Sequence, residues 1–236
     1  MRVGVIGYGQ FAQFAIPLVS KLSEVIAYDI AGGEGTKTLQ EVCSTDLVVF
    51  AVPAQAFDAA CAAAQQFIQP TTLIADISSV KVGPIAMMRK YFLNNEILGT
   101  HPIFGPQSGK DGIVGLPIVL FNVSWTESHY AACKDFLGGT LKLHVIEQSA
   151  EQHDKEMARV QGLTHFIGRA LGSIDMTAYP TSTKSYTHLL ELVELLKNDS
   201  WDLFRTIQME NPYAENVRKE FLAELHDLEE KLKRDV

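Results

Sequence analysis

Residues 3–22 read VGVIGYGQFAQFAIPLVSKL, and this stretch decides the fold. A short β-branched run leads into Gly7, Gly9 and Ala12, which form a GxGxxA pattern ahead of a segment of helical length. Glycines in such a turn let a pyrophosphate approach the backbone closely, and the first N–H groups of the following helix stabilise its charge. We therefore predict a strand, a tight turn and a helix that bind a dinucleotide. A glycine turn that only packs the helix onto the sheet is the alternative.

Six further strand-like runs follow before residue 148. They alternate with segments of helical length, which is typical of a doubly wound α/β sheet with buried parallel strands. We predict strands within residues 2–6, 25–29, 46–52, 72–77, 96–100, 116–121 and 141–146. Residues 1–148 are therefore expected to form a Rossmann-type dinucleotide-binding domain.

The pattern changes after residue 148. Apolar residues then recur at helical spacing over residues 157–174, 186–196, 200–209 and 217–232, which predicts an all-α domain over residues 149–236. About 88 residues of amphipathic helix make a thin core by themselves. We therefore expect these helices to pair with a second copy of the chain, as a homodimer.

The composition narrows the class of partner. The 236 residues are 47 % hydrophobic with a net charge of −8, and the basic residues do not cluster, which disfavours nucleic acid or a membrane surface. No apolar run reaches the roughly 18 residues of a membrane span, and the N-terminal run is too short for a signal peptide. Three widely spaced cysteines favour neither disulfides nor zinc. We expect a cytoplasmic protein without a metal and with a small-molecule substrate.

An acid at the end of the second predicted strand bears on the cofactor. Asp29 lies 20 residues beyond Gly9, where a carboxylate accepts hydrogen bonds from the adenosine ribose and repels a 2′-phosphate. This position favours NAD over NADP. The predicted cofactor-binding residues are Gly7, Tyr8, Gly9, Gln10, Phe11, Asp29, Ile30, Ala51, Val52, Pro53 and Ser78.

Polar residues follow the fourth and fifth predicted strands. Ser78, Ser79 and Lys81 come directly after the fourth, where a serine helix cap is the alternative reading, and His101 precedes Pro102 in a glycine-rich turn after the fifth. A histidine displayed at this edge of the sheet is placed to accept a proton from a substrate hydroxyl while hydride leaves the same carbon, with Ser79 orienting its ring. A packed structural histidine is the alternative. Residues 104–117 then supply a flexible loop that closes over a small polar substrate.

The first helix of the C-terminal domain carries four further polar candidates. His153 and Asp154 lie in its first turn, and Gln161 and His165 follow one turn apart on the same side. These positions predict polar groups in a cleft between the domains. The alternative is a solvated first turn in which Asp154 only favours the helix dipole.

Four blocks of sequence resemble the prephenate/arogenate dehydrogenase family of tyrosine biosynthesis, and most closely its plant-type arogenate dehydrogenases. They are DISSVK at 76–81, GTHPIFGPQSGKDG at 99–112, EQHDKEMARVQGLTHFIGRAL at 151–171 and TSTKSYTHLLELVELLKNDSWDLF at 181–204. The resemblance implies a Rossmann domain, a helical dimerisation domain and an active site between them. It also implies NAD(P)-dependent oxidative decarboxylation of arogenate or prephenate, to tyrosine or 4-hydroxyphenylpyruvate. His101 is then the catalytic base on the ring 4-hydroxyl, with Ser79 as its partner.

Two departures from the family pattern concern specificity. Thr187 stands where many prephenate-using members carry an arginine, whereas Thr183, Lys184 and Tyr186 match the plant-type TK-x-Y pattern, so Lys184 is expected to hold a carboxylate. Plant-type members generally favour NADP, whereas Asp29 favours NAD. The resemblance also implies that an acid at the position of Asp154 accompanies arogenate use.

The expected substrate-binding residues come from both domains. They are Ser79, Thr100, His101, Gln107, Ser108, His153, Asp154, Gln161, His165, Lys184 and Tyr186. Two other readings stay open: a β-hydroxyacid dehydrogenase, which would rely on a helical lysine base, and a dinucleotide-binding dimer without turnover. The choice between arogenate and prephenate, feedback inhibition by tyrosine and a fused partner domain also stay open.

Overall fold

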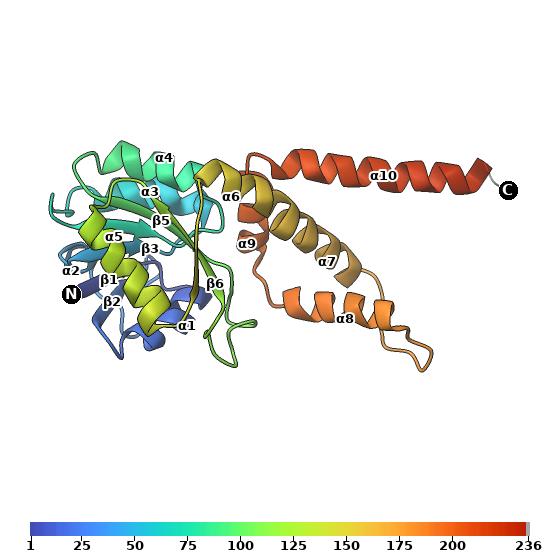
Figure 1. Cartoon of the computed structure of the whole chain (residues 1–236), viewed down its shortest axis with the longest axis horizontal. Coiled ribbons are helices and arrows are strands. Elements are labelled where there is room, and N and C mark those ends of the chain that lie inside the picture. Colours follow the sequence, from blue (N-terminus) through green and yellow to red (C-terminus); the bar gives the residue numbers. More distant parts are fainter. Residues whose placement is uncertain (235–236) are drawn as a thin grey trace. The chain divides into compact units, whose positions relative to one another are not determined.

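The computed structural model describes residues 1–234, which divide into two compact units, residues 1–151 and residues 152–234. The division falls inside helix α6 (Ala150–Met157), three residues beyond the boundary expected at residue 148. Figure 1 gives the element labels.

The first unit is built on one seven-stranded sheet in the order β2-β1-β3-β4-β5-β6-β7. All seven predicted strands are present, and the fold class expected from the sequence is confirmed. The strands are β1 (Arg2–Ile6), β2 (Glu24–Tyr28), β3 (Leu47–Phe50), β4 (Leu73–Asp76), β5 (Ile97–Pro102), β6 (Pro117–Asn122) and β7 (His144–Glu147).

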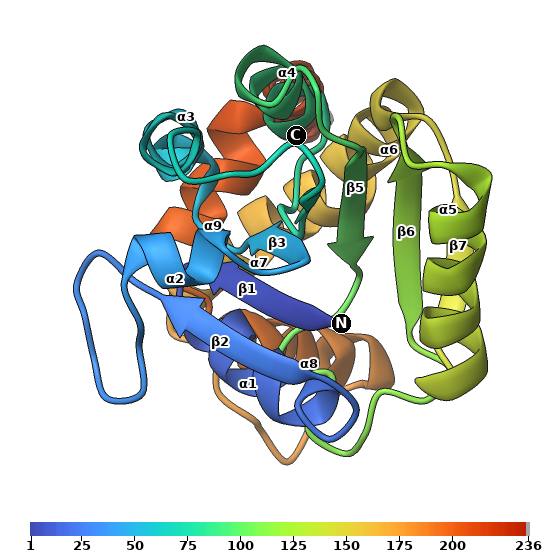
Figure 2. The ribbon, with the colours of Figure 1, turned by 90° about the vertical axis from the view of Figure 1, so that its left-hand side faces the viewer.

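One strand departs from the all-parallel expectation. β6 pairs antiparallel with β5, with His101 opposite Val119, whereas every other pairing of the sheet is parallel. Figure 2 shows the two arrows side by side and pointing in opposite directions. The reason is the connection, because residues 103–116 contain no helix that would carry the chain back across the sheet.

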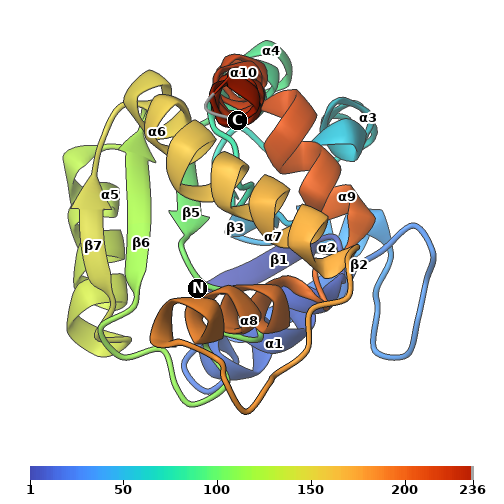
Figure 3. The same ribbon diagram turned by 90° about the vertical axis from the view of Figure 1, so that its right-hand side faces the viewer.

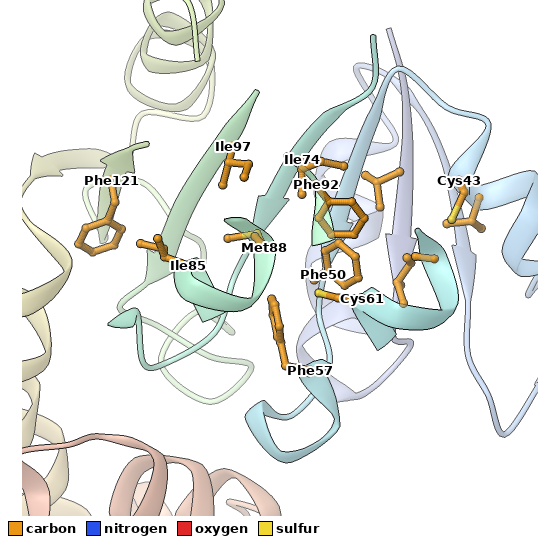
Figure 4. Close-up of a cluster of buried hydrophobic side chains, with 14 of the residues drawn as sticks. Cys43, Phe50, Phe57, Cys61, Ile74, Ile85, Met88, Phe92, Ile97 and Phe121 are labelled. Carbon is orange, nitrogen blue, oxygen red and sulfur yellow. The ribbon is translucent and has the colours of Figure 1, made fainter. Parts of the chain in front are cut away.

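Helices cover both faces of this sheet. Alternate residues of β3 point to opposite faces: Val48 and Phe50 pack with α2, α3 and α4, whereas Leu47 and Val49 pack on the side of α1 and α5. Figure 4 shows the aromatic centre of the first cluster, where Phe50 lies between Phe57 and Phe92. The helices are α1 (Gln10–Val19), α2 (Leu39–Cys43), α3 (Ala54–Ala64), α4 (Val82–Tyr91) and α5 (Glu127–Lys134), with the π-helical segment η1 (Asp135–Thr140).

The second unit is helical, as expected. α6 passes through the π-helical segment η2 (Ala158–Leu163) into α7 (Thr164–Gly172), and the three follow one another along one path in Figure 3. The remaining elements are α8 (Lys184–Leu196), α9 (Trp201–Arg205), the π-helical segment η3 (Thr206–Glu210) and α10 (Ala214–Arg234).

The apolar face predicted over residues 157–174 is only partly buried. Val160 is 59 % exposed and Ile174 is 58 % exposed, whereas Met157 is buried. The π-helical bonding of η2 changes the phase of the helix after Met157, and α7 ends at Gly172. The prediction assumed an unbroken period of 3.6 residues, and it therefore wrongly put Val160 and Ile174 on the buried face.

Candidate active site

The glycine-rich turn joins β1 to α1 and lies against the carboxyl end of β3, where the strand order reverses direction. Gly7 has a φ of 104°, and a Cβ on it would lie 2.5 Å from the carbonyl oxygen of Ala51 and 3.0 Å from Val52. Gly9 occupies the N-cap position of α1 and has no side chain with which to cap it. Ligands bind at this reversal point in open α/β sheets, so the predicted residues of the β1 and β3 turns do lie together.

Asp29 connects the glycine turn to the loop after β2. Its carboxylate accepts hydrogen bonds from the N–H of Tyr8 at 2.8 Å and from the N–H of Ala31 at 2.9 Å. The next residue, Ile30, is 92 % exposed. Asp29 therefore also has a structural role, because it connects the glycine turn to the loop after β2, and its spacing in the sequence did not indicate this role.

β4 and β5 bring the next candidates to the same edge of the sheet. The register pairs Asp76 with Gly99, so Ser78 lies two residues past the end of β4 and His101 two residues farther along the adjacent β5. Ser78 is buried, Ser79 is half-buried and His101 is 3 % exposed.

The expectation that His101 is displayed in a glycine-rich turn is wrong. β5 continues through Pro102, and His101 lies inside the strand, paired with Val119 of β6. The antiparallel neighbour extends the strand, because it supplies backbone partners beyond the point where β4 ends. The site therefore has a buried histidine on a rigid strand.

A buried ion pair, Asp76 with Lys81, underlies this edge, and the sequence pattern did not predict it. The side chains of Asp76 and Lys81 are both 0 % exposed, and the Lys81 ammonium bonds to Asp76 Oδ2. Lys81 also donates to the carbonyl oxygen of Thr100 at 2.5 Å. Burial raises the pKa of Asp76, although Lys81 and the Ser78 and Thr100 N–H groups oppose the shift. The sequence signal for this ion pair is an acid at the end of a buried strand, five residues before a lysine.

Thr100 and the following loop are also engaged locally. The Thr100 hydroxyl donates to the backbone oxygen of Asp76 at 2.6 Å. Gln107 and Ser108 are exposed, and the Ser108 hydroxyl accepts from the N–H of Gly105 at 3.0 Å. The start of the loop is anchored, because the ring of Phe104 packs against the rings of Phe11 and Phe14 on α1.

In the second unit, His153 and Asp154 form a buried pair. Both side chains are 0 % exposed, and His153 Nδ1 lies 2.8 Å from Asp154 Oδ1. The amide of Asn211, from the turn before α10, donates to the backbone oxygen of Asp154 at 2.8 Å. The solvated first turn considered as an alternative is therefore absent.

Gln161 and His165 lie farther along the same helical path. The side-chain Oε1 of Gln161, within η2, is buried and has no hydrogen-bond partner among residues 1–234. A buried acceptor in this state costs about 1–3 kcal/mol, which a bound donor would recover. Burial lowers the pKa of His165 to about 4, so its 3.4 Å contact with Asp199 is polar rather than ionic near neutral pH.

Lys184 and Tyr186 begin a different helix of the second unit. Lys184 is exposed at the start of α8, and the N–H of Tyr186 donates to the hydroxyl of the N-cap residue Thr183 at 3.3 Å. The Tyr186 hydroxyl donates to the backbone oxygen of Thr177 at 3.0 Å. Both Thr183 and Tyr186 thus have local structural roles, and Lys184 keeps its ammonium accessible.

The described part of the chain contains neither a metal-binding cluster nor a membrane-spanning helix. Within residues 1–234, no group of three His, Cys, Asp or Glu side chains is arranged to hold a metal ion. The same part of the chain contains no helix that is both long and apolar enough to cross a bilayer.

Comparison with known proteins gives consistent matches. A family model described as "Prephenate dehydrogenase, nucleotide-binding domain" matches residues 22–120, and one described as "TYRAAT1-like, C-terminal domain" matches residues 170–236. Arogenate dehydrogenase 2, chloroplastic, of Arabidopsis thaliana is 31 % identical over 255 residues, which cover 96 % of this chain and 71 % of that protein. Arogenate dehydrogenase 1, chloroplastic, of the same plant is 28 % identical over 265 residues, or 98 % of this chain and 39 % of that protein.

A solved structure resembles the whole chain. It is the crystal structure of prephenate dehydrogenase from A. aeolicus in complex with hydroxyphenyl propionate and NAD+, with a TM-score of 0.72 and 18 % identity. The match covers 100 % of this chain and 91 % of that one. At this identity the likeness establishes the fold.

Proposed function

Because the chain belongs to the prephenate/arogenate dehydrogenase family and is an NAD(P)-dependent dehydrogenase, we propose that it oxidatively decarboxylates arogenate, with prephenate as the second candidate substrate. The observation that carries the proposal is the position of His101 in β5 and of Ser79 just past the end of the adjacent β4, at the edge of the sheet that holds the glycine turn. A base, a hydride acceptor and an oriented ring alcohol are what this reaction needs.

The residues of the glycine turn fit a dinucleotide. A Cβ on Gly7 would collide with Ala51, so the turn stays free of a side chain, and no described residue lies within 4 Å of a Cβ built on Gly9. Gly9 and the start of α1 would hold the pyrophosphate, and Asp29 would hold the ribose hydroxyls, which favours NAD over NADP. When bound, the nicotinamide accepts the hydride that leaves the substrate.

The proposed catalytic residues move one proton. His101 accepts the proton of the ring 4-hydroxyl as the hydride leaves the same carbon, which turns the alcohol into a dienone. The ring carboxylate then leaves as carbon dioxide, its bonding electrons enter the ring, and the former carbonyl oxygen takes a proton to become a phenol. Ser79 orients the imidazole, and burial of His101 keeps water from the transfer.

We assign substrate selection to the second unit. Arogenate carries an ammonium where prephenate carries a keto group, so an anion at Asp154 favours arogenate. We assign a substrate carboxylate to the exposed Lys184 and a substrate hydrogen-bond donor to Gln161, whose buried amide oxygen has no partner among residues 1–234.

The helical unit is also proposed to form a homodimer. Leu222, Leu225, Leu228 and Leu232 of α10 are between 47 % and 70 % exposed. A second copy that covers this face would remove a contiguous apolar surface from water.

One assay tests the proposed reaction. NADH formation is measured with arogenate and with prephenate under identical conditions, with NADP in place of NAD in a parallel series. Release of carbon dioxide together with reduced cofactor is expected. Failure of both substrates to reduce either cofactor contradicts the proposal.

A further inference from the structure

A single buried cation connects the end of β4, which the Ser78–Ser79 turn follows, to the part of β5 that carries His101. The Lys81 ammonium bonds to the Asp76 carboxylate at the end of β4 and to the Thr100 carbonyl at 2.5 Å, next to His101 in the chain. The same carboxylate accepts from the N–H of Ser78 at 2.9 Å. Asp76, Lys81 and Thr100 are called the strand-end clamp below.

Each partner of the clamp is bonded from more than one side. The Thr100 hydroxyl donates to the backbone oxygen of Asp76 at 2.6 Å, and the Thr100 N–H lies 3.4 Å from Asp76 Oδ1. The Lys81 ammonium also lies over the ring of Phe121 on β6, 5.8 Å from its centroid. The cation therefore connects β4, β5 and the antiparallel strand β6.

Stability alone is a poor explanation for this arrangement. A fully buried ion pair is often no more stabilising than well-packed apolar residues of similar volume, because desolvation of both charges offsets their attraction. What the pair does provide is directed bonds to two separate backbone segments, through the Ser78 N–H to Asp76 and through Lys81 to the Thr100 carbonyl.

We propose that Lys81 is a positioning residue for proton transfer. Through its bonds to Asp76 and Thr100, Lys81 holds the part of β5 that carries His101 against the Ser78–Ser79 turn. The inference rests on the proposed function, because it assigns to Lys81 a role that acts through His101. Displacement of a base by about 1 Å costs on the order of 100-fold in rate. Binding of substrate and cofactor depends much less on that displacement.

The test uses the double variant Asp76→Asn/Lys81→Met in the full-length protein, because removal of Lys81 alone would leave a buried charge without its partner. We expect kcat to fall about 10- to 100-fold, while both KM values stay within about threefold. The matched control is Asp58→Asn/Lys90→Met, which removes an exposed 3.1 Å ion pair of the same unit and should leave kcat unchanged.

A mutant cycle separates positioning from general damage. If Lys81 acts through His101, the clamp variant should cost little further rate in a His101→Asn background. An unchanged kcat in the folded double variant, or an equal loss in both backgrounds, would overturn the inference. Full turnover by His101→Asn alone would instead reject the proposed base, and the inference with it.

A second variant covers the case in which the double variant does not fold. Thr100→Val removes only the 2.6 Å hydroxyl bond to Asp76 and keeps the side-chain shape. A smaller loss of kcat, again absent in the His101→Asn background, is expected. A loss that appears in KM alone would count against the positioning role.

Discussion

The carboxylate of Asp29 accepts a hydrogen bond from the backbone N–H of Tyr8, 21 residues earlier in the chain, at 2.8 Å. This bond joins the end of β2 to the glycine turn. The carboxylate therefore stands beside the proposed pyrophosphate site and shapes the turn that forms it.

Asp29→Ser is expected to weaken NAD binding and to improve NADP binding relative to NAD, because the substitution removes the charge that repels a 2′-phosphate. Fluorescence titration with both cofactors measures the change. Asp46→Ser is the control and should leave both affinities unchanged. Asp46 likewise accepts a hydrogen bond from a backbone N–H, that of Arg2, but at the end of β1 away from the glycine turn. Tighter binding of NADP than of NAD by the unmodified protein would sink the assignment.

His101→Asn is expected to lower kcat by about two to four orders of magnitude while NAD still binds, because the amide approximates the shape of the ring and lacks its basicity. Steady-state kinetics and cofactor titration give the two values. His129→Asn removes an exposed histidine paired with Glu96 and should leave turnover intact. Retention of more than about a tenth of the activity by His101→Asn would show that another group is the base.

Asp154→Asn is expected to reduce the preference for arogenate over prephenate. A desolvated charge pair with the substrate ammonium contributes about 2–3 kcal/mol, or roughly 30- to 150-fold in kcat/KM. Ratios of kcat/KM for the two substrates test this, with the exposed Asp202→Asn as control. Preference for prephenate by the unmodified enzyme, or an unchanged ratio in the variant, would contradict it.

The exposed leucines of α10 predict self-association. Light scattering at low micromolar concentration should give twice the 26.0 kDa chain mass. Leu225→Glu/Leu228→Glu should shift the mass towards the monomer, since each charge would be buried in the proposed interface. Leu93→Glu, at an 83 % exposed position of the first unit, should leave the mass unchanged. A monomer mass for the unmodified protein rejects the dimer.

His165 predicts a loss of stability in mild acid. Its pKa is lowered from 6.5 to about 4 by burial and, less, by Arg169, so the unfolded chain binds a proton that the folded chain rejects between these values. The free energy of unfolding should therefore fall by about 2 kcal/mol from pH 7 to pH 5 through this group.

Urea unfolding at the two pH values tests the His165 effect. The half-buried carboxyl of Asp199 faces His165 and has a pKa raised by desolvation, so the comparison uses His165→Asn rather than the total pH dependence. The variant should lose most of the difference, and the exposed His188→Asn should keep it. An identical pH dependence in His165→Asn would refute the assignment.

The sequence by itself determined the seven strands, the helical second unit, the GxGxxA turn and the family. These features are local: a glycine that tolerates a φ of 104° and a five-residue run with β-branched Val3, Val5 and Ile6 can be recognised without knowledge of their neighbours. The order of the four family blocks carried the resemblance, and the identity of 31 % with the plant relative confirms it.

The tertiary structure alone decided what lies against these elements. Antiparallel β6 extends β5 and buries His101. Lys81 donates a hydrogen bond to the carbonyl oxygen of Thr100, 19 residues later in the sequence, and Asn211 donates to the backbone oxygen of Asp154, 57 residues earlier. Hydrophobic periodicity shows which face of an element is apolar, but the partner of a polar group depends on which strand or helix lies beside it. Burial, ion pairing and the lowered pKa of His165 arise from that choice of neighbour, because desolvation is a property of the packed site and not of the residue.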